Sequence, residues 1–200
     1  TVGSAPPRGI CGSGLIDAAA GMFQAGILDF KGKFVGSHPR VRRGHEGAEY
    51  CLVPAEETAT GQDIAITQQD MDYFMDSKAA LCGAVAVLLK RYRLTPEDIR
   101  HVYLAGAFGA FADMRSLTAF GILPPFPNAT VQGIGNGSLS GAYLALLSLR
   151  KRREAQAIAD AMVYIDLLVD PDFVEEYTAA LSIPGRSELF PAGRDRGGHA

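Results

Sequence analysis

The sequence has 200 residues, of which 48% are hydrophobic and 20% charged, and its formal net charge is −3. This composition is typical of a folded globular protein, and the slight negative charge argues against a nucleic-acid binder that relies on a basic surface. No apolar run reaches the roughly 18 residues that a membrane span needs, and the start does not resemble a secretory signal. Because the chain opens on Thr1 and not on methionine, we expect a piece of a longer protein, with one lobe over residues 1–191 and a disordered tail over residues 192–200.

The cysteines of this sequence are few and far apart. Cys11, Cys51 and Cys82 form no C-x-x-C pair, and their spacing matches neither a zinc site nor an iron–sulfur site. We therefore expect no metal centre within the chain, and we expect the reducing conditions of the cytoplasm.

A glycine-rich turn opens the first predicted helix, between Gly9 and Gly26. Ser13 is placed to cap this helix, and apolar residues follow at helical spacing. Two interpretations stay open. Gly12, Ser13 and Gly14 can bring backbone and hydroxyl groups near a phosphate or carbonyl, or they can simply form a cap that contacts a neighbouring strand.

Between Leu28 and Thr60 the pattern is irregular and mostly polar. Two short strands are predicted over Glu49–Pro54 and Asp63–Thr67, joined by a polar loop, and they are expected to form a hairpin at the edge of a sheet.

The longest predicted helix begins at Thr67 and ends near Arg93, with Thr67 and Asp70 placed as a capping box. Lys78 follows Phe74 by four residues, so it lies on or beside the apolar stripe of this helix. Such a lysine either extends its ammonium outward to solvent or meets an anion in a cleft.

Two segments share the order strand, glycine turn, helix. The first is a predicted buried strand over His101–Leu104 followed by Gly106 and Gly109, and the second runs through Thr130–Ala142. A helix start exposes backbone N–H groups where negative charge is favoured, and ligands of α/β proteins bind at the carboxyl ends of strands. The two turns are therefore predicted to form opposite lips of a nucleotide cleft.

The remaining elements are predicted to be helical. Thr95–Asp98 is a capped turn, Asp113 caps a helix that ends at Gly121, and Arg150–Asp170 is amphipathic. The basic run Arg150–Arg153 is expected to be a solvated face. A further helix is expected over Asp170–Leu181.

Four separated motifs, in one order, resemble a known family. They are GICGSGLID from Gly9, ITQQDMDYFMDSKAALCGAV from Ile66, LAGAFGAF from Leu104 and GIGNGSLSGA from Gly133. Together they resemble the C-terminal actin-like ATPase (ASKHA) domain of the reductive activators of corrinoid proteins. The resemblance extends from Gly9 to about Pro191.

This resemblance implies the fold class. It is an α/β fold, the second lobe of the ribonuclease H-like fold of actin, sugar kinases and acetate kinase. A mixed sheet is flanked by helices, and a helical extension follows at the C-terminus.

The resemblance also implies a function. Family members bind ATP with Mg2+ and return Co(II) corrinoid protein to Co(I) in methyl-transfer systems, with a [2Fe–2S] cluster on an N-terminal domain. The implied partners are the corrinoid protein, the N-terminal part of the same chain and a second copy in a homodimer. Neither nucleic acid nor membrane is an implied partner. This piece alone is expected to be inactive.

Site residues follow from the matched motifs. Gly106, Ala107, Phe108 and Gly109 match the adenosine-contacting motif, Gly135, Asn136 and Gly137 match the second connecting turn, and Lys78 matches a helix residue near the ribose or adenine. The Asp-x-Gly-Thr phosphate hairpins of the superfamily are missing from this sequence. The chain is therefore expected to supply the base-binding half of the site. The alternatives are a kinase-like or dehydratase-activator subunit of the same superfamily, or a protein-interaction module without nucleotide binding.

Overall fold

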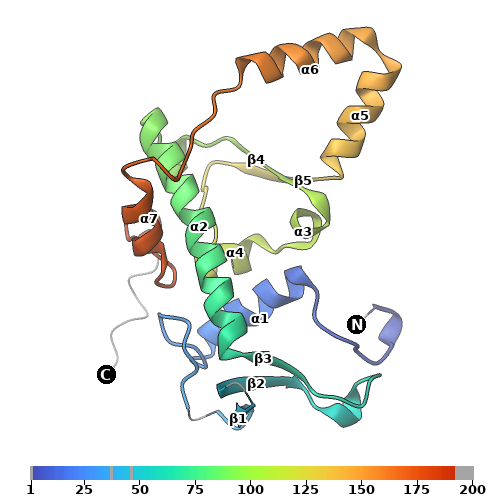
Figure 1. The fold of residues 1–200 in the computed structure, drawn as a ribbon, viewed down its shortest axis with the longest axis vertical. Helices are drawn as coiled ribbons and strands as arrows, with labels where there is room; N and C mark the ends of the chain where they lie inside the picture. Colours follow the sequence, from blue (N-terminus) through green and yellow to red (C-terminus); the bar gives the residue numbers. More distant parts are fainter. Residues whose placement is uncertain (1, 37, 46, 192–200) are drawn as a thin grey trace.

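The computed structural model describes residues 2–36, 38–45 and 47–191 (Figure 1). The α-helices are α1 (Gly12–Gln24), α2 (Gln68–Tyr92), α3 (Gly106–Phe111), α4 (Met114–Phe120), α5 (Gly137–Leu147), α6 (Leu149–Ala161) and α7 (Phe173–Ala180). The strands are β1 (Val41–Gly44), β2 (Gly47–Val53), β3 (Ile64–Thr67), β4 (His101–Ala105) and β5 (Thr130–Gly135). Short 3-10 turns occur at Val2–Ser4, Ala55–Glu57 and Pro96–Asp98.

The first sheet is antiparallel, in the order β1-β2-β3. The predicted hairpin of β2 and β3 is present, but a third strand, β1, pairs with the other edge of β2. The irregular sequence pattern did not reveal β1, because it is short and holds two arginines. Its Arg42 forms ion pairs with Glu49 on β2 (2.8 Å) and with Asp63 just before β3 (2.5 Å). These pairs link β1 to β2 and to the start of β3.

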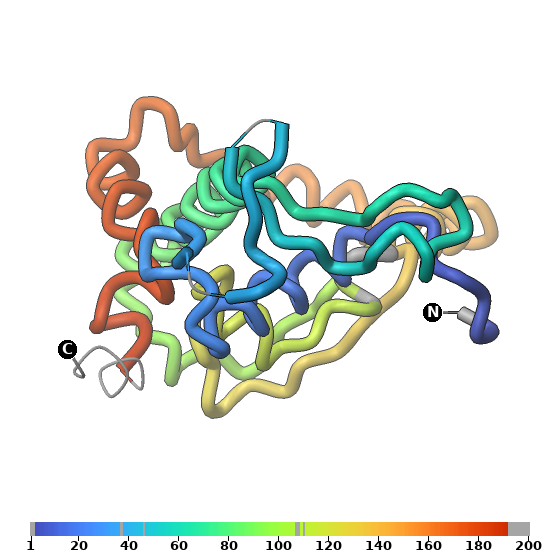
Figure 2. Tube along the Cα trace, turned by 90° about the horizontal axis from the view of Figure 1, so that it is seen from below, coloured from blue at the N-terminus to red at the C-terminus, as the bar shows by residue number. Residues whose placement is uncertain are grey.

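Helix α2 is the central element, and its predicted start is confirmed. Thr67 caps it, and Asp70 completes the capping box. Figures 1 and 2 both show α7 on one side of α2 and the layer formed by β4 and β5 on another. A cluster of buried apolar side chains joins the beginning of α2 to α1 and α4, with Phe74 stacked on Phe120 at 5.1 Å between ring centroids. A second, smaller cluster joins α2 to α7.

The second sheet is the parallel pair β4–β5, as the two strand–turn–helix segments predict. The prediction that β4 is buried is wrong. Val102 and Leu104 are half-buried, whereas Tyr103 is 59% exposed, and β5 is exposed from Thr130 to Ile134. The exposure of β4 alternates, so one of its faces is covered and the other meets solvent, whereas β5 is exposed on both faces over Thr130–Ile134.

Beyond β5 the chain departs from the body of the molecule. Helices α5 and α6 form an arm that rises from the end of β5 and returns toward the end of α2 (Figure 1). The predicted helix that continues to Asp170 ends earlier, at Ala161, and residues 162–169 have no regular secondary structure. Ser148 interrupts the arm with extended backbone and caps α6. In the described part of the chain, no helix is long and apolar enough to cross a bilayer.

One of the predicted helix caps is confirmed and another is wrong. Asp113 caps α4, and Gly121 ends it in the left-handed conformation, as predicted. At α1, however, the cap is Cys11 and not Ser13. The expected tail, residues 192–200, lies outside the described residues.

Candidate nucleotide site at the ends of β4 and β5

The parallel register brings the two glycine turns together. Pairing runs from His101 opposite Thr130 to Ala105 opposite Gly135, with an irregularity before the last pair. Gly106 begins α3 directly after β4, and Asn136 and Gly137 follow directly after β5. The two turns therefore lie side by side at the carboxyl edge of the sheet, where α/β proteins bind ligands.

Gly106 and Gly135 give this edge its shape. Their φ angles are +80° and +61°, a region that residues with a Cβ rarely adopt. Apart from the chain neighbours and the backbone of α3, no described heavy atom lies within 4 Å of the position that a Cβ would take at either residue. Glycine is therefore favoured here for its backbone conformation, and no described side chain fills the space beside either residue.

Gly109 is packed closely against the end of β4. A Cβ at this residue would lie 2.9 Å from the Leu104 Cβ and 3.0 Å from the Leu104 carbonyl carbon. Glycine is thus needed for the close packing of α3 on β4, and the chain itself occupies the space that a side chain would take. The sequence motif alone did not distinguish packing from ligand contact.

Gly137, in the second turn, faces the end of β4. Its Cβ position is 3.8 Å from the Ala105 Cβ at the end of β4 and 3.4 Å from the Ile134 Cδ1. These are ordinary contacts, and φ at Gly137 is not positive, so a small side chain is sterically acceptable there. Its neighbour Asn136 caps α5, because the Asn136 Oδ1 accepts a hydrogen bond from the Leu139 N–H at 2.9 Å.

Ala107 and Phe108 belong to α3, but their side chains lie outside the described structure. Their predicted contact with adenosine remains a prediction.

Lys78 is buried, with only 2% of its surface exposed, so it does not extend to solvent. Its Nζ donates to the main-chain carbonyls of Ala180 (2.6 Å), Ser182 (2.5 Å) and Pro184 (3.0 Å). Burial lowers the pKa of Lys78 to about 8, whereas the three carbonyl oxygens favour its charged form. The ammonium thus donates to the last residue of α7 and to the segment after it, which leaves none of its three N–H groups for a nucleotide in this conformation.

The glycine turn before α1 is organised by its cysteine. The Cys11 Sγ accepts a hydrogen bond from the Gly14 N–H at 3.4 Å and lies 3.4 Å from the Ser13 Oγ. The Ser13 hydroxyl and the Gly14 amide lower the pKa of this exposed thiol. Of the two interpretations of this turn, the capping one describes the observed contacts, with Cys11 as the capping residue.

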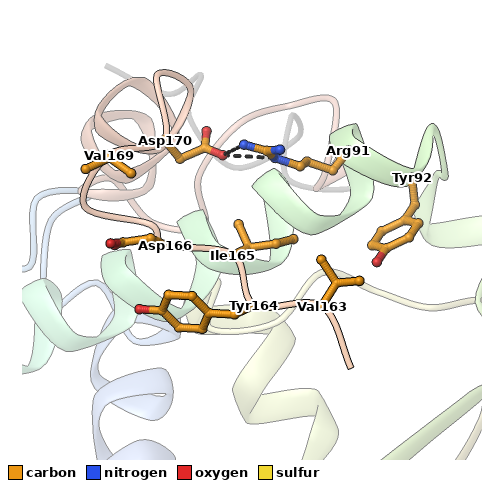
Figure 3. Close-up of a pocket in the computed structure, with 8 residues that line it drawn as sticks. All are labelled: Arg91, Tyr92, Val163, Tyr164, Ile165, Asp166, Val169 and Asp170. Atoms are coloured by element: carbon orange, nitrogen blue, oxygen red, sulfur yellow. Dashed lines mark hydrogen bonds and ion pairs between the residues drawn. The ribbon is translucent and has the colours of Figure 1, made fainter. Parts of the chain in front are cut away.

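Two cavities lie elsewhere. One, of about 340 Å3, is lined by Arg91 and Tyr92 at the end of α2 and by residues of the segment after α6 (Figure 3). The other, of about 520 Å3, lies between Phe30 and the facing residues of α2 and α7. Neither is lined by residues of the glycine turns. In the described ranges, no cluster of three or more His, Cys, Asp or Glu side chains is arranged to hold a metal ion, and Cys51 and Cys82 are buried.

The two turns present main chain to the space beside them, whereas the carboxylate of Asp113 is engaged as a helix cap. The residues of the turns, Gly106–Gly109 and Gly135–Gly137, include none with an acidic, basic or nucleophilic side chain.

Comparison with known proteins agrees with this architecture. The family model described as the C-terminal domain of RACo, the ASKHA domain, matches residues 1–194. The chain is 34% identical over 185 residues to the corrinoid activation enzyme RamQ of Eubacterium limosum, covering 88% of this chain and 31% of that protein. It is 27% identical over 151 residues to the [Co(II) methylated amine-specific corrinoid protein] reductase of Methanosarcina barkeri, covering 76% of this chain and 24% of that protein.

A solved structure shows the same fold. The reductive activator for corrinoid, iron-sulfur protein superposes with a TM-score of 0.87 at 39% identity, over 96% of this chain and 31% of that chain. The predicted fold class is thereby confirmed. The chain spans less than a third of the length of the relatives that it matches. Its sequence and its fold place it in the family of C-terminal ASKHA domains of the reductive activators of corrinoid proteins.

Proposed function

We propose that residues 1–191 form the C-terminal lobe of a longer, ATP-dependent reductive activator. This activator returns a Co(II) corrinoid protein to Co(I) in a methyl-transfer system. The lobe supplies the adenosine-binding half of the nucleotide site. The observation that carries the proposal is the pairing of Ala105 with Gly135, which makes neighbours of two turns with open space beside them.

The relatives support the reaction class. Their names are corrinoid activation enzyme, Co(II) corrinoid protein reductase and reductive activator for corrinoid, iron-sulfur protein. All are longer than this chain, which leaves room for the remaining parts of the activator. In this proposal, the groups that hold phosphate and Mg2+ and the domain that carries a [2Fe–2S] cluster lie in those parts.

When bound, ATP would supply free energy for the change of state, and the cluster would supply the electron. In this proposal, the residues of this chain bind the adenosine part of ATP. Gly106 and Gly135 hold the main chain in conformations that leave room for base and ribose. Gly137 in the second turn faces the end of β4 and leaves the space there unfilled. Ala107, Phe108, Gly109 and Asn136 are the remaining residues of the two matched motifs that this proposal places at the nucleotide. Lys78 is not part of this proposal, because its ammonium is used within the chain.

Titration calorimetry with ADP tests the proposal, using this 200-residue chain and the chain extended by the sequence encoded upstream. We expect weak binding by the short chain and much tighter binding by the extended chain, because the extension adds the phosphate half. A folded extended chain that binds neither ADP nor ATP would remove the mechanism. It would leave the protein-interaction module as the better description.

The other parts of the proposal concern partners and place. We expect the corrinoid protein to be the partner, the cytoplasm to be the compartment and a homodimer to be the assembly. Sedimentation of the extended chain, alone and with its corrinoid protein, tests the assembly and the partner directly.

A further inference from the structure

The arm and the segment that follows it expose an unusually large set of apolar side chains. On α5 these are Leu139, Tyr143, Leu144, Leu146 and Leu147, and after α6 they are Met162, Val163, Tyr164, Leu168 and Val169. Leu146 is 73% exposed and Tyr164 85% exposed. Large exposed apolar side chains in this number mark a place where another surface packs. We use the name apolar arm for α5 together with residues 162–169, which leaves out α6.

The composition of α5 says what kind of surface covers it. From Gly137 to Leu149 there is no charged residue, and the large apolar side chains cover roughly half of the circumference by the 3.6-residue period. Glycine, alanine and serine make up the rest. A helix that lies in a membrane interface needs a strongly polar face, and α5 has none. Its composition is that of a helix packed between protein elements.

The segment after α6 is irregular. Residues Val163 to Asp166 have no assigned secondary structure, and Figure 3 shows them passing the end of α2 beside Arg91 and Tyr92. Among the hydrogen bonds of the described residues, none involves the main-chain N–H or C=O groups of Val163 to Asp166. Valine, tyrosine and isoleucine in succession are strong strand formers. The segment thus has the sequence of a strand, and its main chain has no hydrogen-bond partner within the described residues.

We propose that the apolar arm is an intramolecular docking surface, covered by the part of the longer protein that precedes this chain. In this docked state, Val163–Asp166 receives a β-strand from that part. The inference rests on the proposal that the chain is the C-terminal lobe of a longer activator.

Two observations favour this occupant. First, an incoming strand satisfies the free main-chain groups of Val163–Asp166, which a lipid surface cannot do. Second, the solved relative shares the fold over 96% of this chain, and this chain covers only 31% of the relative, so more than twice as much protein accompanies the same lobe there. A second copy of this chain and a membrane surface are the competing occupants.

Hydrogen exchange read by mass spectrometry, without nucleotide, tests the proposal. In the 200-residue chain, the amides of Val163–Asp166 and of α5 should exchange rapidly. In the upstream-extended chain these amides should exchange at least about 100-fold more slowly, because the strand pairing must open before they exchange. Since no nucleotide is present, a failure of ADP binding would leave this measurement unaffected.

Matched variants sharpen the test. Leu146→Asp in the extended chain should restore rapid exchange across α5, whereas Tyr73→Asp, at an exposed position on α2, should not. Proline leaves an extended backbone intact and removes one N–H group. Successive N–H groups of a strand point to opposite edges, so only one of the two substitutions Tyr164→Pro and Ile165→Pro should weaken the pairing.

Three results would overturn the proposal. The segment could exchange as fast in the extended chain as in the short one. The 200-residue chain could sediment as a dimer that Leu146→Asp converts to a monomer, which would assign the arm to a second copy. The chain could bind phosphatidylglycerol vesicles through the arm, with binding lost in Leu146→Asp, which would assign it to a membrane surface.

Discussion

Ala105 and Gly135, the last residues of β4 and β5, lie opposite each other in the parallel pair. This register relationship brings together two turns that are about 30 residues apart in the sequence. Gly137, in the second turn, faces the end of β4, since its Cβ position is 3.8 Å from the Ala105 Cβ.

Gly137→Ala should weaken ADP binding by the extended chain about tenfold, or about 1.4 kcal/mol, because a methyl group enters the space between the turns. The fold should be unaffected, since the contacts at that position are ordinary ones. Gly141→Ala, one turn later in α5 and in open space, is the matched control. Calorimetry with ADP checks both variants. Equal affinities in the two variants would place the ligand away from Gly137.

Gly109→Val should unfold more easily than the parent chain, by about 1–3 kcal/mol, because its Cβ would press on the Leu104 backbone. Any loss of ligand binding in this variant is therefore secondary to disturbed packing of α3 on β4. Urea denaturation followed by circular dichroism measures the change. A Gly109→Val protein of unchanged stability would contradict the assignment of this glycine to packing.

Lys78→Met should destabilise the chain by roughly 2–4 kcal/mol, because three buried carbonyl oxygens lose a charged donor. Lys31→Met, at an exposed position, should change the free energy of unfolding by less than about 0.5 kcal/mol. Denaturant titrations compare the two variants. The opposite pattern, an unchanged stability with lost ADP affinity, would return Lys78 to the nucleotide site.

Asp170 makes part of the stability dependent on pH. Its carboxylate accepts two hydrogen bonds from Arg91 (Figure 3), and this pairing holds the pKa of Asp170 below its usual range. A carboxyl group with a lowered pKa in the folded state stabilises the fold above its unfolded pKa of about 3.9. That contribution is lost as the pH falls through the folded pKa.

Asp170→Asn should therefore be less stable than the parent chain at pH 7, and the difference should shrink below about pH 4. Urea denaturation at a series of pH values measures it. Asp160→Asn, at an exposed position on α6, is the control and should follow the parent chain. A constant difference between Asp170→Asn and parent down to pH 2 would exclude the ion pair with Arg91 as its cause.

Cys11 should be the cysteine that reacts first with iodoacetamide in the native chain. It is exposed and its pKa is lowered by the Ser13 hydroxyl and the Gly14 amide, whereas Cys51 and Cys82 are buried. Ser13→Ala should slow the alkylation of Cys11 at pH 7, because less thiolate is present. Mass spectrometry of timed samples gives the rates. An unchanged rate in Ser13→Ala would mean that the hydroxyl does not stabilise the thiolate.

Local sequence rules succeeded where structure depends on near neighbours. Thr67 with Asp70, and Asp113 with the residues that follow it, act within one helical turn, so residue type and spacing were sufficient to predict them. At α1 the same rule selected the wrong residue. Cysteine is a weak acceptor that is seldom counted as a cap, yet the Cys11 sulfur takes the place predicted for Ser13.

Long-range packing is where local rules failed. Lys78 meets carbonyls that lie more than 100 residues later in the chain, and no local pattern around Lys78 signals them. Gly109 and Gly106 look alike in the motif, but one is packed against Leu104 and the other faces open space. Such differences depend on which elements lie next to each other.

By itself, the sequence determined most of the elements in their order, though neither β1 nor the end of α6 at Ala161, and it determined the two strand–turn–helix segments and, through separated motifs, the family. These features depend on local backbone preferences and on the spacing of hydrophobic residues, and both involve residues that are close together in the sequence. The tertiary structure alone decided which glycines leave room for a ligand, where the Lys78 ammonium goes and which apolar surface stays uncovered. Those outcomes depend on the register of β4 with β5, the packing of α2 on α7 and the departure of α5 from the sheet, and each of them joins residues that are distant in the chain.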